Sequence, residues 1–230
     1  MLNLVRVAAL SAAGLWAFTA NATILTFDVS GGVTNFANIP QSYGDNVAMT
    51  PDGLGHSYGV GAEGFTPNVV VEYGTAGEDP ALWTTGYGDL TNVHFNDADG
   101  DLTFTVRFTA DPGFLVTLFD FDIASFLSAG QTIAGLEVRN GATDASLFSL
   151  GSTFITGATH AQIAPNVSAN VLILEIDLTG LGSVSDDIGI DNVRFGQSQA
   201  EVETSEAGTL ALLGGALAVI GGVARRRVAA

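Results

Sequence analysis

The chain has 230 residues, no cysteine and no lysine, and its formal net charge is −17 at pH 7. All 24 acidic residues lie between Asp28 and Glu206, where only three arginines accompany them. A nucleic-acid-binding protein needs a basic face that neutralises phosphates, so this composition excludes nucleic acid as a partner. Without disulfides, stability has to come from a packed core or from bound ions.

The first 22 residues have the pattern of a secretory signal peptide. Arg6 supplies a positive charge, and an apolar stretch follows from Val7 to Ala20. Ala20-Asn21-Ala22 is a small-x-small cleavage site. We therefore expect residues 1–22 to form a signal-peptide helix that is removed on export, so that the mature chain begins at Thr23.

Residues 23–200 contain many short apolar stretches separated by turns rich in Gly, Asn and Asp, without long 3.6-residue periodicity. From Leu102 to Thr109, apolar and polar residues alternate, as in a half-buried strand. We expect an all-β fold, a two-sheet antiparallel β-sandwich of the jelly-roll type. The predicted strands are Ile24–Val29, Val69–Tyr73, Val93–Phe95, Leu102–Thr109, Leu115–Phe121, Ile133–Arg139, Ser146–Leu150, Val171–Leu178 and Ile188–Phe195.

Residues 201–206 form an acidic linker, and residues 207–230 form a hydrophobic tail. No charged residue occurs from Ala207 to Ala224. A helix of that length spans about 27 Å, close to the roughly 30 Å of a bilayer's hydrocarbon core. Arg225, Arg226 and Arg227 follow directly, and the positive-inside bias would keep them in the cytoplasm and leave the body outside.

This tail resembles the PEP-CTERM sorting signal of Gram-negative bacteria. The resemblance is carried by Glu206, by Gly208 and Thr209 at the start of the apolar run, and by the three arginines, although Ser205-Glu206-Ala207 stands in place of Pro-Glu-Pro. It implies a sorting protease of the exosortase type as a partner and a cell-surface or extracellular location. A plain membrane anchor is the alternative, so the tail would hold the protein in the inner membrane either transiently or permanently.

The end of the body, Ser185–Phe195, resembles the closing strand of jelly-roll modules, including MAM-like and carbohydrate-binding ones. Its Asp187-Ile188 and Ile190-Asp191-Asn192-Val193 segments carry the similarity. The resemblance implies that the last strand lies beside the first and that acidic residues of the two share a calcium ion. It indicates Asp28 and Asp191 as ligands, with Asp187 as a further candidate, since Ca²⁺ prefers oxygen ligands. Alternatively, Asp191 and Asn192 bind backbone amides at a strand end.

Aromatic residues gather in the loosely patterned segment from Phe36 to Gly88. Sugar rings stack on Trp and Tyr side chains, so we expect Trp83, Tyr58 and Tyr87 to be candidate sugar-binding residues. The alternative is that these rings plug the edge of the core.

The remaining motifs give weaker indications of a functional site. Asn96–Asp101 fits a hairpin turn with Asp99-Gly100 at positive φ better than a calcium loop. Gly55-His56-Ser57-Tyr58-Gly59 matches a serine-hydrolase pattern but lacks the strand before it and the helix after it. The histidines lack partners at metal-ligand spacing, so a zinc site has little support.

We therefore expect no catalytic residues and no enzymatic activity. The predicted function is that of an exported structural or adhesive protein of the cell surface or the biofilm matrix, associated with extracellular polysaccharide. A calcium-supported carbohydrate-binding module is the alternative. Apart from Ca²⁺, no cofactor is expected.

Overall fold

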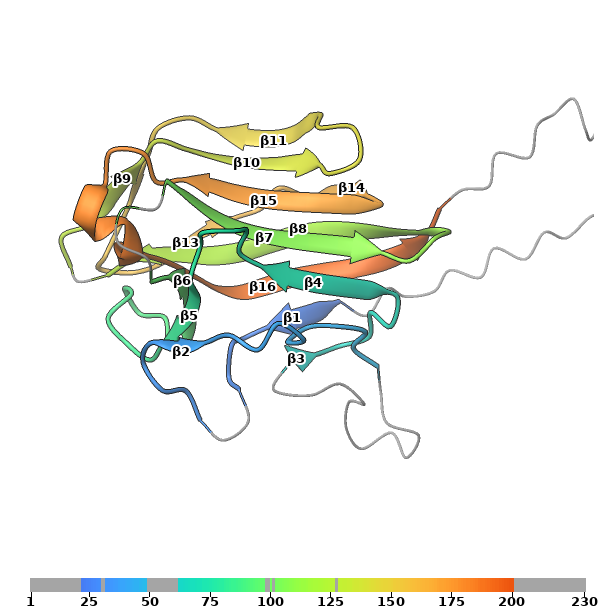
Figure 1. The fold of residues 1–230 in the computed structure, drawn as a ribbon, viewed down its shortest axis with the longest axis horizontal. Helices are drawn as coiled ribbons and strands as arrows, with labels where there is room; N and C mark the ends of the chain where they lie inside the picture. The colour runs from blue at the N-terminus through green and yellow to red at the C-terminus, as the bar shows by residue number, and fades with distance from the viewer. Residues whose placement is uncertain are drawn as a thin grey trace, which may run out of the picture.

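A computed structural model describes residues 22–29, 32–48, 62–97, 100, 102–126 and 128–200. Most of the regular structure is β-strand, and the strand pairs are antiparallel, which confirms the all-β prediction (Figure 1). The predicted signal peptide up to residue 21, and the linker and tail from residue 201, lie outside the described residues. Within the described part of the chain, no helix has the length and apolar character needed to cross a bilayer.

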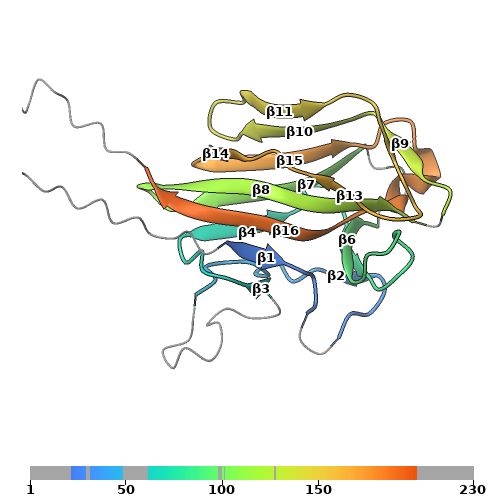
Figure 2. The same cartoon turned by 180° about the vertical axis from the view of Figure 1, so that it is seen from behind.

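Two sheets enclose the core, and a small third sheet stands at one end (Figures 1 and 2). The five-stranded sheet has the order β11(Ser146–Leu150), β10(Gly135–Asn140), β15(Val171–Asp177), β7(Thr103–Ala110), β4(Val69–Tyr73). The nine-stranded sheet follows the order β13(Ala161–Ile163), β8(Phe114–Ser125), β16(Ile188–Gln199), β6(Val93–Asn96), β5(Pro80–Trp83), β2(Ala37–Asn38). In the same sheet, β1(Thr23–Leu25) pairs with β16, β3(Ala62–Glu63) pairs with β1, and β14(Val167–Ala169) pairs with β8. The third sheet pairs β9(Gln131–Ile133) with β12(Thr153–Ile155), and a 3₁₀ segment, η1(Gly182–Asp187), precedes β16.

The strands form where side chains alternate between the core and the outside. On β7, Phe104 and Phe108 are 1% and 0% exposed, whereas Thr103 and Arg107 on the opposite face are only half-buried. β15 pairs with β7 along its whole length and shows the same alternation. This two-residue periodicity fixes the register, because a shift by one residue would turn the apolar set toward water.

The opening strand is shorter than expected. We predicted a strand over Ile24–Val29, but β1 ends at Leu25. Phe27 has φ of +52°, a left-handed conformation that ends the strand, and its ring is fully buried in the core. The conformational cost of a left-handed Phe is offset by burial of its ring.

β1 pairs with β16, so the first and last strands lie side by side, with Thr23 opposite Phe195. The described body therefore begins and ends in neighbouring strands. This pairing also brings the segment after β1 close to the middle of β16, which is where the candidate site lies.

Candidate functional site

A polar pocket of about 250 Å³ opens where the segment after β1 meets β16. Its lining comes from four separate parts of the chain: Thr26, Asp28, Asp89, Leu90, Thr91, His160, Asp191 and Asn192. Two of the three predicted calcium ligands, Asp28 and Asp191, are among them. The third, Asp187, is not; its carboxylate accepts a hydrogen bond from Gln131 at 3.3 Å instead.

A bulge in β16 shapes the floor of the pocket. The pairing of β16 with β8 shifts register between Asp191 and Arg194, and Asn192 has φ of +49°. Asparagine tolerates this left-handed conformation better than most residues do, and bulges re-aim the side chains beside them. The amide of Asn192 donates to Asp122 on β8 at 3.0 Å, while its backbone N–H donates to Asp191 at 2.6 Å.

Two buried carboxylates are cross-strand neighbours here, and one of them, Asp191, lines the pocket. Asp191 lies directly opposite Asp122 in the β16–β8 pair, and these residues are 5% and 8% exposed. Burial raises the pKa of Asp191 to about 7, helped by the charges of Asp122 and Asp28, while the Asn192 N–H and His160 act in the opposite direction. At neutral pH, Asp191 thus sits close to its point of half-ionisation and can take up or release a proton.

The rim of the pocket is more exposed. The amide of Asn92 donates to the carboxylate of Asp28, and Asn92 has φ of +60°. His160 contacts Asp89 through Nδ1 at 2.8 Å, and its Nε2 lies 3.9 Å from a carboxylate oxygen of Asp122. Hydrogen bonding to Asp89 raises the pKa of His160, although the ring is too exposed for this pair to hold the site rigidly.

The residues present fit a calcium ion only in part. Carboxylate and amide oxygens are the ligands that Ca²⁺ prefers, and the pocket offers both. Among the described residues, however, no group of three acidic, histidine or cysteine side chains converges closely enough to hold a metal. The chemistry that this arrangement supports is recognition of a cation or of hydroxyl groups by oxygen and amide groups.

Two of the predicted sugar-stacking residues, Trp83 and Tyr87, are described, and neither lines this pocket. Tyr87 is 2% exposed, and its hydroxyl donates to the backbone oxygen of Asp186 at 2.5 Å, so its ring belongs to a satellite core. Trp83 is half-buried and packs edge-on against Phe36 and Phe126. The ring centroids lie 4.6 Å apart in the first pair and 5.4 Å apart in the second. Phe36 is 55% exposed. Tyr58 lies outside the described residues, as do the sorting residues Glu206, Gly208, Thr209, Arg225, Arg226 and Arg227.

His94 illustrates a histidine with a core role. It is fully buried among the rings of Phe27, Tyr73 and Phe104, and its Nδ1 lies 3.2 Å from the Ala81 carbonyl. Burial lowers its pKa to about 4, so the ring is neutral at ordinary pH.

Sequence reasoning missed Asp122, Asp89 and His160. A signal for Asp122 was available, because Asp120 and Asp122 are the only charged residues in a mainly apolar strand. No local signal marks His160, since its partner Asp89 is 71 residues away.

Comparison with known proteins adds a distant structural likeness. No family model matches the chain, and no curated protein matches it. Among solved structures, the chain is similar to a cyclase from Fischerella sp. TAU, at 16% sequence identity and a TM-score of 0.36, over 60% of this chain and 88% of that one. A likeness at this level assigns the chain to no family and bears on no activity.

Proposed function

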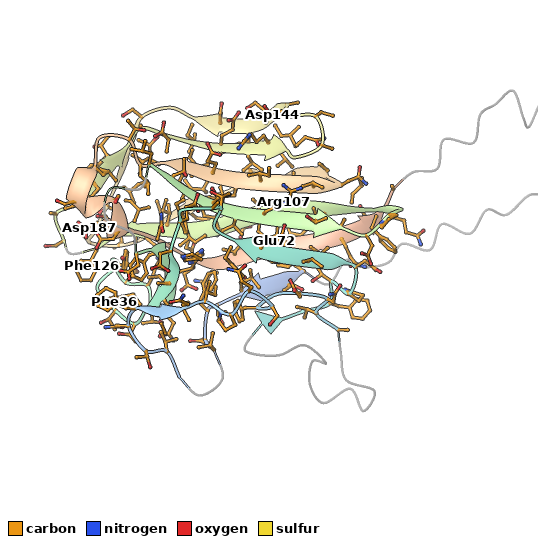
Figure 3. The ribbon with its side chains drawn as sticks, viewed as in Figure 1. Phe36, Glu72, Arg107, Phe126, Asp144 and Asp187 are labelled. Carbon is orange, nitrogen blue, oxygen red and sulfur yellow. The ribbon has the colours of Figure 1, made fainter. Side chains whose placement is uncertain are left out.

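We propose that the chain is an exported, non-enzymatic structural or adhesive protein of the cell surface or extracellular matrix, sorted through its tail at residues 207–230. The pairing of β1 with β16 carries the proposal, because a body whose first and last strands are neighbours can be held at its ends and present the rest of its surface. The same pairing supports a jelly-roll arrangement of the two sheets. In Figure 3, Phe36 and Phe126 lie at the end of the sandwich away from the last residues of β16.

The tail is tested in a Gram-negative bacterium that has an exosortase-type protease. Protease added to intact cells should digest the wild-type protein, which is displayed outside. Replacing Arg225, Arg226 and Arg227 together with Ala should abolish this display, because the positive charges orient the tail. Wild-type protein that remains in the cytoplasm would overturn the proposal.

A second candidate function is calcium-supported carbohydrate binding, favoured by the shared position of Asp28 and Asp191 in one pocket. Because burial raises the pKa of Asp191 to about 7, the stabilisation that its protonated form provides is complete below about pH 4 and is lost as the pH rises to about 7. Above that pH, a calcium ion would relieve the cost of the buried charge. Asp191 and Asp28 would hold the ion.

Asp191→Asn tests this reading. Without calcium at pH 8, the variant should be more stable than the wild type by up to about 4 kcal/mol, and the gain should shrink toward pH 4. Added Ca²⁺ should raise the melting temperature of the wild type but not of the variant. Asp187→Asn, outside the pocket, is the matched control and should keep the calcium response. A wild-type melting temperature that ignores both Ca²⁺ and chelator would exclude a calcium site.

The carbohydrate arm is tested by calorimetry with the producing organism's own extracellular polysaccharide. Trp83→Ala should remove saturable binding, whereas Phe65→Ala, which removes a ring that is 42% exposed on the segment that contacts Gln197 near the end of β16, should not. Saturable binding that survives Trp83→Ala would count against stacking at this end.

A further inference from the structure

We propose that strand β11 is a docking edge for a second copy of this chain, which pairs with it antiparallel and joins two five-stranded sheets into one. The inference goes beyond the proposed function and uses none of the pocket or tail residues. Among the described strands, β11 pairs only with β10 and ends the five-stranded sheet (Figures 1 and 2). An edge strand presents unpaired N–H and C=O groups that can pair with another strand.

The other edge of the same sheet is closed. The segment Gln41–Val47 runs along β4, where the Val71 N–H donates to Asp45 at 2.7 Å. Gln41 accepts from the Tyr73 N–H at 3.1 Å and donates to the Tyr73 carbonyl at 3.0 Å. These side chains occupy the positions that a neighbouring strand would take, so β4 cannot accept one.

The edge strands of the nine-stranded sheet are too short to pair extensively with a strand of another molecule. β2 has two residues, and β13 and β14 have three each. Short edge strands offer few hydrogen bonds to a partner. Among the described edges, β11 combines five residues with a side that no other segment pairs with.

The sequence of β11, Ser-Leu-Phe-Ser-Leu, carries none of the residues that usually block an edge. It has no charge, no Pro and no Gly, in a chain whose net charge is −17. A bulge interrupts its pairing with β10, but the register shift lies at the hairpin end, and Phe148–Leu150 continue in regular register. This regular part remains straight enough to pair on its outer side.

Its core-facing side chains are incompletely covered. Phe148 and Leu150 lie opposite Val138 and Leu136 of β10 and pack against the main core, yet both are only partly buried. Val138 and Leu136 are 0% and 2% exposed. A second copy would add its own Phe148 and Leu150 beside them and extend the core across the edge.

One pairing register keeps Phe148 and Leu150 of both copies on the core side of the joined sheet. If two copies pair symmetrically about Ser149, Phe148 of each lies opposite Leu150 of the other, and both stay on the core side because side chains alternate with period two. No unpaired charge opposes this arrangement at the hairpin end, because Asp144 (Figure 3) contacts Arg139 at 2.6 Å. Beyond Leu150, Gly151 and Ser152 are uncharged.

The negative charge of the chain makes formation of this dimer depend on the salt concentration. Two copies of net charge −17 repel each other at low ionic strength. At about 0.5 M salt the Debye length is well below 10 Å, so the repulsion is screened. The dimer should therefore form more readily as salt is raised.

The absence of cysteine allows a direct test of the register in the full chain. Ser149→Cys is nearly isosteric and exposed, and two copies paired about residue 149 place these thiols opposite each other. Mild oxidation in about 0.5 M salt should yield a disulfide-linked dimer. In the matched variant Ser146→Cys, the two thiols would lie roughly 20 Å apart along the strands, so the chain should stay monomeric. Equal cross-linking of both variants, or none in either, would overturn the proposal; the tail is the same in both and cannot cause a difference.

Sedimentation velocity provides the second readout. Glu137 lies opposite Ser149 on β10 and would neutralise a lysine there, so the test uses a Glu137→Gln background. In that background, Ser149→Lys sets two like charges opposite each other and should weaken the dimer at least about tenfold. Ser198→Lys adds the same charge at an exposed position of the nine-stranded sheet and should leave the dimer unchanged. A wild-type chain that is monomeric at every salt concentration, or a dimer that Ser149→Lys does not weaken, would rule out β11 as the interface.

Discussion

The two edges of the five-stranded sheet are built differently. At β4, the core-facing residues are completely covered: Val69, Val71 and Tyr73 are 0%, 0% and 3% exposed. At β11, the corresponding Phe148 and Leu150 are only partly buried. The difference comes from an irregular segment, Gln41–Val47, whose side chains and backbone substitute for a strand at one edge only. Closure of a sheet edge therefore does not require another strand.

The largest expected effect comes from truncating the ring that seats this covering segment. Tyr43 is fully buried, 5.5 Å from the ring of Phe27, and its carbonyl accepts a hydrogen bond from the Tyr73 hydroxyl at 2.7 Å. Tyr43→Ala should lower the free energy of unfolding by about 3–5 kcal/mol, because it leaves a cavity. Phe148→Ala at the open edge should cost only about 1–2 kcal/mol, since less area is buried there. Chemical denaturation measures both, and equal losses would erase the contrast between the edges.

A smaller effect is expected from Gln41→Leu. This change removes the two hydrogen bonds that Gln41 makes with the N–H and C=O of Tyr73, at a cost of about 1–3 kcal/mol. Hydrogen exchange should accelerate at the Tyr73 amide and remain unchanged on β11. Gln162→Leu, at an exposed position of β13, is the matched control. Unaltered exchange at Tyr73 would mean that Gln41 does not close this edge.

The smallest effect is expected from the pH dependence of Asp45. Burial raises the pKa of Asp45 above its ordinary value, and the charge of Glu72 adds to this, while the Val71 N–H lowers it. A raised pKa means that the stability contributed by protonation is present at low pH and is lost as the pH rises through the native pKa. Asp45→Asn keeps an acceptor for Val71 without the charge, so it should be slightly more stable than the wild type at pH 7. The gain should vanish below about pH 4, where the wild-type carboxyl is protonated in both states. A gain that is independent of pH would assign it to another cause.

The main strands were predictable because their signal is local. The alternation predicted at Leu102–Thr109 appears as β7, Thr103–Ala110, and Val69–Tyr73 and Ser146–Leu150 appear with the expected bounds. β5 was missed, since Pro80 opens a strand of four residues whose burial shows no alternation. Such strands form because neighbours cover both faces, which a local pattern does not record.

The candidate site was predictable only through its two strands. The resemblance of Ser185–Phe195 to known closing strands indicated Asp191 and, through the neighbouring first strand, Asp28. It grouped Asp187 with them, but that carboxylate belongs to η1 and contacts Gln131. The pocket's other groups arrive from loops after β5 and β12, and loop positions depend on packing rather than on periodicity.

The sequence by itself determined the all-β class, the acidic surface and the faces that its strands bury, because composition and two-residue alternation are properties of short segments. The tertiary structure alone decided which carboxylates share a pocket and which sheet edge is closed. Both depend on contacts between residues far apart in the chain, such as Asp45 with Val71 and Asp191 with Asp122. Those contacts form only when the whole core has packed and set the register of every strand.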